Sequence, residues 1–180
     1  MAGRRALVFG GSVAVAAAAA GVATGIWRAR VEARDASAAQ ALFTSTLPDA
    51  GGAQQALSQW QGRPLIVNFW APWCAPCVEE MPDLQRARDE FQARGLEIIG
   101  VGLDSAARIR QFRDDHRITL PLLVAGAQGS SLGDQLGNAA GVLPYTVLIG
   151  ADGRIRERKI GRIRPDELRR WLDALPASKG

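Results

Sequence analysis

Two cysteines carry the most specific chemical signal in this sequence. Cys74 and Cys77 stand three positions apart, directly before an apolar pattern of helical spacing that runs to about Phe91. Residues three apart in a first helical turn face the same side, so their sulfurs can bond or separate with little backbone movement. Pro76, between them, has no N–H to lose in that turn. The spacing therefore predicts a pair that exchanges disulfides. The alternative is two cysteines that are buried, or paired incidentally, and have no redox role.

The two cysteines are expected to act differently. Cys74 would lie at the start of the helix, where unpaired backbone N–H groups and the positive end of the helix dipole favour the thiolate over the thiol. Cys77 would lie deeper in the helix. We therefore predict that Cys74 attacks a partner disulfide and that Cys77 resolves the mixed disulfide.

From Leu42 onward, strand-like and helix-like segments alternate. Leu65–Trp70 is a continuous apolar run, which is typical of a strand buried on both faces, and the helix of the cysteines follows it. The other expected elements are a strand over 96–103, a helix over 105–115 capped by Ser105, a strand over 119–124, a helix over 131–136, a hairpin of strands 145–149 and 154–160, and a helix over 165–175. This order predicts an α/β fold with a mixed central sheet covered on both sides.

The stretch Asn68–Pro82, NFWAPWCAPCVEEMP, resembles the thioredoxin superfamily, and within it the TlpA/ResA-like membrane-anchored thiol–disulfide oxidoreductases. The likeness covers residues 42–175, and the stretch 115–141 is similar to a segment that this group inserts into the basic fold. The resemblance implies a thioredoxin-like three-layer fold with a mixed central sheet, preceded here by one N-terminal hydrophobic helix.

Two prolines match the superfamily pattern. Pro82 would kink the helix that carries the cysteines, and the alternative is a helix that ends early. The resemblance implies that Pro144 faces the dithiol after a cis bond to Leu143, that Leu143 offers its backbone to the substrate chain, and that Trp73 covers Cys74. From the residues alone, Pro144 would be an ordinary trans proline, because only about 5–6% of X–Pro bonds are cis.

Asn68 marks a departure from cytoplasmic thioredoxins, which carry a buried Asp at this position. An amide cannot accept the proton that Cys77 must release. The TlpA/ResA-like pattern uses a carboxylate three residues past the second cysteine, where this chain has Glu80. Cys77 and Glu80 would be neighbours on the helix, so Glu80 is a candidate base. The alternative is a solvated helix carboxylate like Glu79.

The N-terminal segment is expected to lie outside this fold. An uncharged stretch runs from Ala6 to Trp27, and at about 1.5 Å per residue it reaches roughly 33 Å, enough for a hydrocarbon core of about 30 Å. Its Ala and Gly content makes it only weakly apolar. We expect a signal anchor over residues 1–28, and a signal peptide cleaved near Ala18–Ala20 is the alternative.

Residues 29–41 are expected to form a linker, and residues 42–180 the thioredoxin-like domain. The formal net charge is +4, and residues 1–40 contribute five Arg against two acidic residues. The rest of the chain is therefore nearly neutral, and nothing in it indicates a nucleic-acid partner.

Metal and cofactor chemistry have little support in the composition. The chain has one His and two Cys, which excludes a Cys₄ or Cys₂His₂ zinc centre within one chain. We expect no metal and no cofactor. Two rivals on the same fold stay open. A copper-delivery module requires a wider cysteine spacing and a downstream His. A thiol peroxidase requires Thr three residues before its reactive cysteine, and this chain has Ala71 there.

The resemblance implies a reductase of protein disulfides in a bacterial cell envelope. Its expected location is the inner membrane, with the catalytic domain in the periplasm, or secretion if the signal is cleaved. Its expected partners are disulfide-bearing envelope proteins such as apocytochrome c, and a membrane electron donor that reduces the dithiol again.

Overall fold

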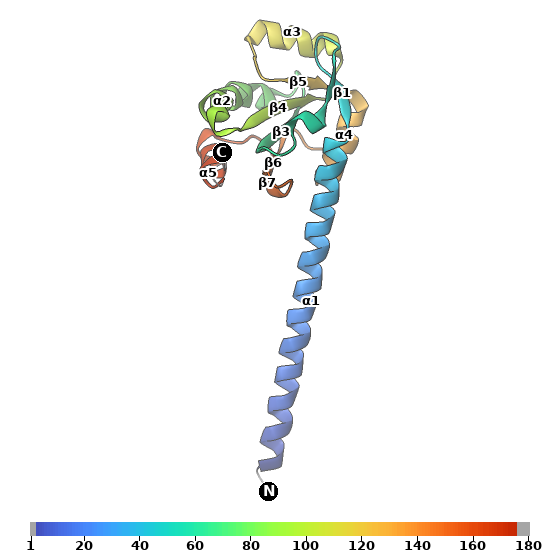
Figure 1. Ribbon diagram of the computed structural model, residues 1–180, viewed down its shortest axis with the longest axis vertical. Helices are drawn as coiled ribbons and strands as arrows, with labels where there is room; N and C mark the ends of the chain where they lie inside the picture. Colours follow the sequence, from blue (N-terminus) through green and yellow to red (C-terminus); the bar gives the residue numbers. More distant parts are fainter. Residues whose placement is uncertain (1–2, 176–180) are drawn as a thin grey trace. The chain divides into compact units, whose positions relative to one another are not determined.

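The computed structural model describes the backbone of residues 3–175 and the side chains of residues 20–175. The chain divides into two compact units, Met1–Asp35 and Ala36–Gly180. Helix α1 (Gly3–Phe43) contributes to both units. The second unit contains all the other helices and strands that the structure describes (Figure 1).

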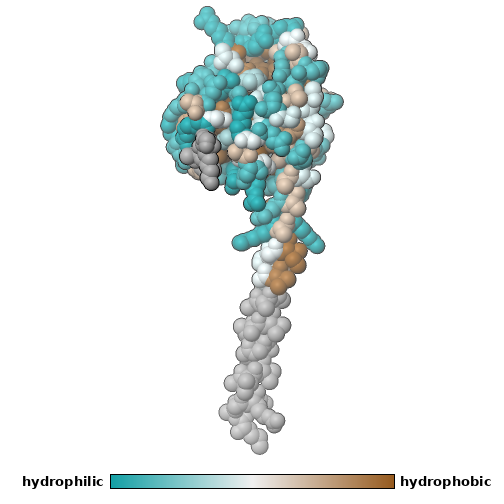
Figure 2. Space-filling model, viewed as in Figure 1, coloured by the Kyte–Doolittle hydropathy of each residue, from teal (hydrophilic) through white to brown (hydrophobic). Residues whose placement is uncertain are grey.

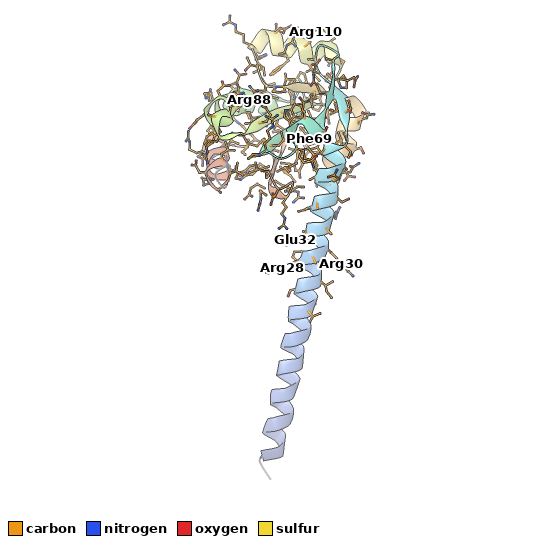
Figure 3. All side chains as sticks on the ribbon, in the orientation of Figure 1. Arg28, Arg30, Glu32, Phe69, Arg88 and Arg110 are labelled. Carbon is orange, nitrogen blue, oxygen red and sulfur yellow. A yellow bond between two sulfur atoms is a disulfide. The ribbon has the colours of Figure 1, made fainter. Side chains whose placement is uncertain are left out.

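The described side chains of the first unit are exposed almost throughout. Figure 2 shows hydrophobic surface on the described part of α1, and the large exposed apolar residues there are Val22, Ile26, Trp27 and Val31. Charged side chains follow on the same helix, where Figure 3 labels Arg28, Arg30 and Glu32.

None of the helices within the described residues combines the length and the apolar character needed to cross a membrane. The anchor expected over residues 1–28 is therefore not confirmed. The side chains of residues 1–19 lie outside the described residues, and so does most of the cleavage site considered at Ala18–Ala20.

The segment 29–41, expected as a linker, is helical and forms the last part of α1. Its end packs into the second unit, where Ala39 is 1% exposed and Leu42 is fully buried. The second unit consequently begins at Ala36, ahead of the expected start at residue 42. The difference arises because small and apolar side chains near the end of α1 are buried in the domain core.

The second unit is built on a five-stranded mixed sheet with the spatial order β5-β4-β3-β6-β7. The strands are β3 (Leu65–Trp70), β4 (Glu97–Gly102), β5 (Leu122–Val124), β6 (Tyr145–Ile149) and β7 (Ile155–Ile160). Strands β3, β4 and β5 are parallel, whereas β6 runs antiparallel to both β3 and β7. A separate antiparallel pair is formed by β1 (Thr46–Pro48) and β2 (Gln54–Ala56). The predicted α/β class and mixed sheet are confirmed.

The sheet separates two hydrophobic cores, which makes the three layers of the fold. Side chains of β3 alternate between its faces. Ile66 and Trp70 join the core that is covered by α2 (Ala75–Phe91), α3 (Ala106–His116) and α5 (Pro165–Asp173). Val67 and Phe69 join the opposite core, with the end of α1 and with α4 (Gly126–Gln135) (Figure 3). Asn68 lies between Ile66 and Trp70 in this alternation and therefore belongs to the α2 face.

Local signals in the sequence explain some helix boundaries but not all. Ser105 caps α3 by accepting a hydrogen bond from the Arg108 N–H. Helix α2 continues past Pro82, so the alternative of an early end is excluded. Helix α4 starts at Gly126, ahead of the expected residue 131, because Gly129 does not break it. A Cβ at Gly129 would lie 2.8 Å from Leu103 Cδ1, so this glycine permits a close approach of the helix.

Candidate active site

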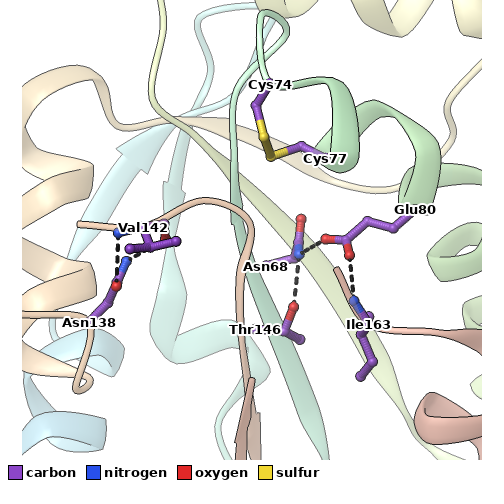
Figure 4. The surroundings of a disulfide bond; sticks show 8 residues. All are labelled: Asn68, Cys74, Cys77, Glu80, Asn138, Val142, Thr146 and Ile163. Carbon is purple, nitrogen blue, oxygen red and sulfur yellow. Dashed lines mark hydrogen bonds between the residues drawn. A yellow bond between two sulfur atoms is a disulfide. The ribbon is translucent and has the colours of Figure 1, made fainter. Parts of the chain in front are cut away.

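The two cysteines lie where β3 gives way to α2. The Cys74 carbonyl accepts hydrogen bonds from the Cys77 and Val78 N–H groups, which makes Cys74 the residue that begins the helix. Pro76 lies in the first turn of α2. Cys74 and Cys77 form a disulfide with a Cα–Cα distance of 5.2 Å (Figure 4). The expectation that a helical start would bring the two sulfurs within bonding distance is confirmed.

The two sulfur-bearing residues differ in their access to solvent. Cys74 is 7% exposed and Cys77 is fully buried. Trp73, directly before them, is 65% exposed. A large partner can therefore reach the Cys74 side of the disulfide, beside an exposed indole, while Cys77 stays inside the core.

The segment before β6 has the backbone form that the resemblance implied. The peptide bond between Leu143 and Pro144 is cis. Leu143 packs against the core that contains Cys74 and Cys77. The Pro144 carbonyl accepts a hydrogen bond of 2.8 Å from the Gly161 N–H, so this segment is joined to the loop between β7 and α5.

Asn138, which no sequence pattern predicted as a site residue, also holds this segment. Its Nδ2 donates to the Val142 carbonyl at 2.9 Å, and its Oδ1 accepts from the Val142 N–H at 3.1 Å (Figure 4). Asn138 is 5% exposed, whereas Val142 is 41% exposed. A buried amide thus fixes the backbone of an exposed apolar residue next to the cis bond. The available signal was an Asn after Gly137, which alone indicates only a turn.

Glu80 is fully buried, so the alternative of a solvated carboxylate is wrong. Its Oε1 accepts from Asn68 Nδ2 at 2.7 Å, and its Oε2 accepts from the Ile163 N–H at 2.8 Å (Figure 4). Burial raises the pKa of Glu80 from 4.5 to about 7, although these two hydrogen bonds and the charge of Arg162 oppose the rise. Glu80 can therefore exchange a proton near neutral pH.

Asn68 connects Glu80 to the sheet. Its Nδ2 also donates to Thr146 Oγ1 at 3.0 Å, and Asn68 and Thr146 are register partners on β3 and β6. Both residues are fully buried. No local sequence pattern links Thr146 or Ile163 to this cluster, since Ile163 lies 83 positions from Glu80.

The described residues offer no group of three or more His, Cys, Asp or Glu side chains that could hold a metal ion. The single His, His116, stacks on Phe112 with ring centroids 4.2 Å apart. Its Nδ1 lies 3.1 Å from the Phe112 carbonyl oxygen. His116 therefore makes its described contacts within α3, and none of them is with a cysteine.

The comparisons with known proteins agree with this site. A family model described as AhpC/TSA family matches residues 38–158. The thiol-disulfide oxidoreductase ResA of Bacillus thuringiensis (strain Al Hakam) is 30% identical over 125 residues, which cover 69% of this chain and 70% of that protein. ResA of Geobacillus thermodenitrificans (strain NG80-2) is 28% identical over 132 residues, which cover 72% of each chain.

A solved structure shares the fold. It is a secreted Mycobacterium tuberculosis disulfide oxidoreductase, described as homologous to E. coli DsbE. It is similar to this chain with a TM-score of 0.63 and 21% identity, and the similarity covers 74% of this chain and 97% of that one.

Proposed function

Because the chain belongs to the AhpC/TSA family and has a thioredoxin-like fold, we propose that it is a thiol–disulfide oxidoreductase that reduces disulfides in other proteins. One observation carries this proposal. Cys74 and Cys77 form a disulfide at the start of α2, where Cys74 is 7% exposed beside the exposed Trp73 and Cys77 is fully buried. Such a pair can hold two electrons and pass them to a partner disulfide.

In the reduced chain, the Cys74 thiolate attacks one sulfur of the partner disulfide. A bond forms between Cys74 Sγ and that sulfur, and the other partner sulfur leaves as a thiolate. Cys77 Sγ then attacks Cys74 Sγ, releases the partner and leaves the Cys74–Cys77 disulfide. The partner gains two electrons and the dithiol loses them. The difference in exposure between the two cysteines supports this order of attack.

Glu80 is proposed as the base for the second step. Cys77 must lose its proton to attack, and a carboxylate with a pKa of about 7 is partly ionised at neutral pH. Glu80 stands one helical turn after Cys77 on α2. Its burial keeps the proton exchange away from bulk water.

The partner chain is proposed to bind across Trp73 and the segment Val142–Pro144. Trp73 and Val142 expose apolar surface, and Leu143 packs against the core of the two cysteines. The backbone of Leu143 would pair with an extended partner segment, as in strand addition. The hydrogen bonds from Asn138 to Val142 hold this backbone in place before the partner arrives.

The site of action is proposed to be the bacterial cell envelope. One structural relative is described as secreted. Residues 1–28 would direct the chain there, as a retained segment or as a cleaved signal. Oxidising conditions there would require a membrane electron donor to reduce the dithiol again. Proposed clients are disulfide-bearing envelope proteins, among which apocytochrome c has two haem-binding cysteines.

The test is an insulin-reduction assay, combined with equilibration of the dithiol against a glutathione series. We expect reduction of insulin and a dithiol potential below that of the envelope clients. Consumption of hydrogen peroxide at a comparable rate, or stoichiometric binding of copper by the reduced chain, would favour one of the two rivals. A chain whose cysteines do not cycle in any of these assays would refute the proposed function.

A further inference from the structure

Asn68 has one polar atom that the hydrogen bonds described above do not use. Both described bonds of its carboxamide leave from Nδ2, to Glu80 and to Thr146. Asn68 Oδ1 is buried and has no hydrogen-bond partner among the residues that the structure describes. A buried carbonyl oxygen without a donor destabilises the state in which it occurs. A state of the protein that supplies a donor to this oxygen is therefore favoured.

The position of this oxygen indicates which donor could reach it. Asn68 lies on the α2 face of β3, which is also the face that packs against Cys77. Figure 4 shows Asn68 Oδ1 directed toward the disulfide, on the side of the amide away from Thr146. The disulfide has no hydrogen to donate. Reduction places an S–H group on Cys77, and a thiol is a weak donor to a carbonyl oxygen.

The other end of the amide responds to the proton on Glu80. Both carboxylate oxygens of Glu80 accept hydrogen bonds, one from Asn68 Nδ2 and one from the Ile163 N–H. Protonation turns one of these two oxygens into an O–H donor, and the N–H group that faces that oxygen then has no acceptor there. The backbone N–H of Ile163 cannot turn away. The Asn68 carboxamide can rotate by half a turn, which presents Oδ1 to Glu80 and Nδ2 to Cys77.

We propose that Asn68 is a positioning residue that couples Cys77 to Glu80 through two orientations of its carboxamide. With a Cys77 thiol and an ionised Glu80, Oδ1 accepts from the thiol and Nδ2 donates to the carboxylate. With a Cys77 thiolate and a protonated Glu80, Oδ1 accepts from Glu80 and Nδ2 donates to the thiolate. The net change is the transfer of one proton from Cys77 Sγ to the Glu80 carboxylate, and Asn68 neither gains nor loses an atom. This inference rests on the proposed function, in which Cys77 resolves the mixed disulfide.

The charged groups near Glu80 come from two elements. Asp83 on α2 raises its pKa, and Arg162, in the loop before α5, lowers it. Arg162 also forms an ion pair with Glu79 and lies 3.7 Å from an oxygen of Asp83. From β6, the neutral hydroxyl of Thr146 contacts Asn68. Besides Glu80 and Cys77, the groups that bias the rotation of the amide are therefore Arg162, Asp83 and Thr146.

The first test is spectroscopic and uses the unaltered chain. The side-chain Nδ2H₂ and Cγ signals of Asn68 are followed by NMR in the oxidised and reduced protein from pH 5 to pH 9, and are assigned by their loss in Asn68→Asp. We expect both signals to shift on reduction and to titrate in the reduced protein together with the Cys77 Cβ signal. The Asn138 carboxamide is the internal control, because both its ends are bonded to the Val142 backbone. Asn68 signals that change no more than those of Asn138 would overturn the inference.

The second test is kinetic. Reduced chain is mixed with 5,5′-dithiobis(2-nitrobenzoate), whose first released thiolate reports attack by Cys74 and whose second reports resolution by Cys77. At pH 7 we expect Asn68→Leu and Glu80→Gln each to slow the second phase at least tenfold and to leave the first within twofold. The double variant should be no slower than the slower single variant. Thr146→Val, which keeps the contact between Asn68 and Glu80, should slow the second phase less than Asn68→Leu.

The outcomes separate this inference from the proposed function. An undisturbed second phase in Asn68→Leu, or multiplied effects in the double variant, would refute the coupling while leaving the oxidoreductase intact. Failure of the unaltered chain to reduce insulin would refute the proposed function. The NMR comparison then still decides whether Asn68 responds to the oxidation state of Cys77. That comparison is made on the unaltered chain and needs Asn68→Asp for assignment alone, so it also decides the inference if Asn68→Leu does not fold.

Discussion

At the scale of single residues, Cys74 and Cys77 have unequal surroundings although they share one helical turn. Cys74 begins α2 and is 7% exposed, whereas Cys77 is fully buried in the core under α2. Thiolates at helix starts that keep some access to solvent are the reactive ones, and fully buried thiols need a local base. The roles of Cys74 as attacking residue and Cys77 as resolving residue therefore follow from their positions in the helix.

Serine substitutions should separate the two roles. Cys74→Ser should lose disulfide exchange almost completely, because the accessible nucleophile is gone. Cys77→Ser should accumulate a mixed disulfide between Cys74 and the partner, since nothing displaces it. Mass spectrometry after incubation with an oxidised protein substrate measures the adduct. A Cys77→Ser chain that turns over at the rate of the unaltered chain would show that the roles are assigned wrongly.

Glu80 should also make the stability of the oxidised chain depend on pH. The pKa of Glu80 is raised from 4.5 to about 7, so between these values the folded chain holds a proton that the unfolded chain has released. Stability from this group is therefore full below pH 4.5 and is lost as the pH rises to 7. The loss is about 3 kcal/mol. This pH-dependent loss of stability should disappear in Glu80→Gln.

Urea unfolding of the oxidised chains at pH 4.5, 6 and 8 measures this effect. Relative to the unaltered chain, Glu80→Gln should gain about 3 kcal/mol between the lowest and the highest pH. Glu79→Gln is the matched control, because Glu79 stands beside Glu80 in sequence but is exposed. The control should keep the pH dependence of the unaltered chain. Parallel curves for Glu80→Gln and the unaltered chain would contradict the raised pKa.

At the scale of elements, close packing decided features that local propensity alone would not. Helix α4 contains Gly129 and Gly133, and glycine is a poor helix former. A Cβ at Gly129 would lie 2.8 Å from Leu103 Cδ1 and 3.1 Å from Ala125 Cβ. A Cβ at Gly133 would lie 3.7 Å from the nearest Phe69 atom, which is ordinary contact. Only the first glycine is required by packing.

Alanine substitutions at these two positions should have opposite effects. Gly133→Ala should raise the free energy of unfolding by up to about 1 kcal/mol, because it reduces the freedom of the unfolded chain without a clash. Gly129→Ala should lower it by about 1–3 kcal/mol, because Leu103 must move. Urea unfolding of the two variants measures the difference. A Gly129→Ala chain as stable as Gly133→Ala would show that Leu103 adjusts at no cost.

At the scale of the whole molecule, the sheet has a hydrophobic core on each face, and the end of α1 belongs to one of them. Leu42 is fully buried and Phe43 is 3% exposed, with Val67 and Phe69 in the same core. The part of α1 that precedes Ala36 belongs to the other unit. The smallest chain that folds should therefore keep the end of α1.

Two truncated chains should test this boundary. A chain that starts at Ala36 should keep the stability and the insulin reduction of the full chain, because it retains the whole second unit. A chain that starts at Thr44 should lose about 4 kcal/mol or more, because it lacks the large buried side chains Leu42 and Phe43. Thermal and urea unfolding provide the measurement. Equal stability of the two chains would place the boundary after α1.

The sequence by itself determined most strands of the central sheet, helices α2, α3 and α5, and the reactive pair, but not the β1–β2 pair or the start of α4. Apolar periodicity and the Ser105 cap are local signals, and the Cys74–Cys77 spacing acts within one helical turn, so neighbouring residues were enough to predict them. The resemblance added the cis bond before Pro144. Sequence also identified Glu80 as a candidate base and Asn68 as the residue that replaces the Asp of cytoplasmic thioredoxins, but it left the burial of Glu80 open.

Only the tertiary structure decided the surroundings of those candidates. Thr146 meets Asn68 because β6 pairs antiparallel with β3, and Ile163 reaches Glu80 from 83 positions away. The burial that raises the pKa of Glu80 exists only when α2 packs in the folded core. Solvation and hydrogen bonding depend on what the folded chain places around a group, and no local pattern encodes that. The end of α1 was misjudged for the same reason, since its alanines show their role only when packed against the sheet.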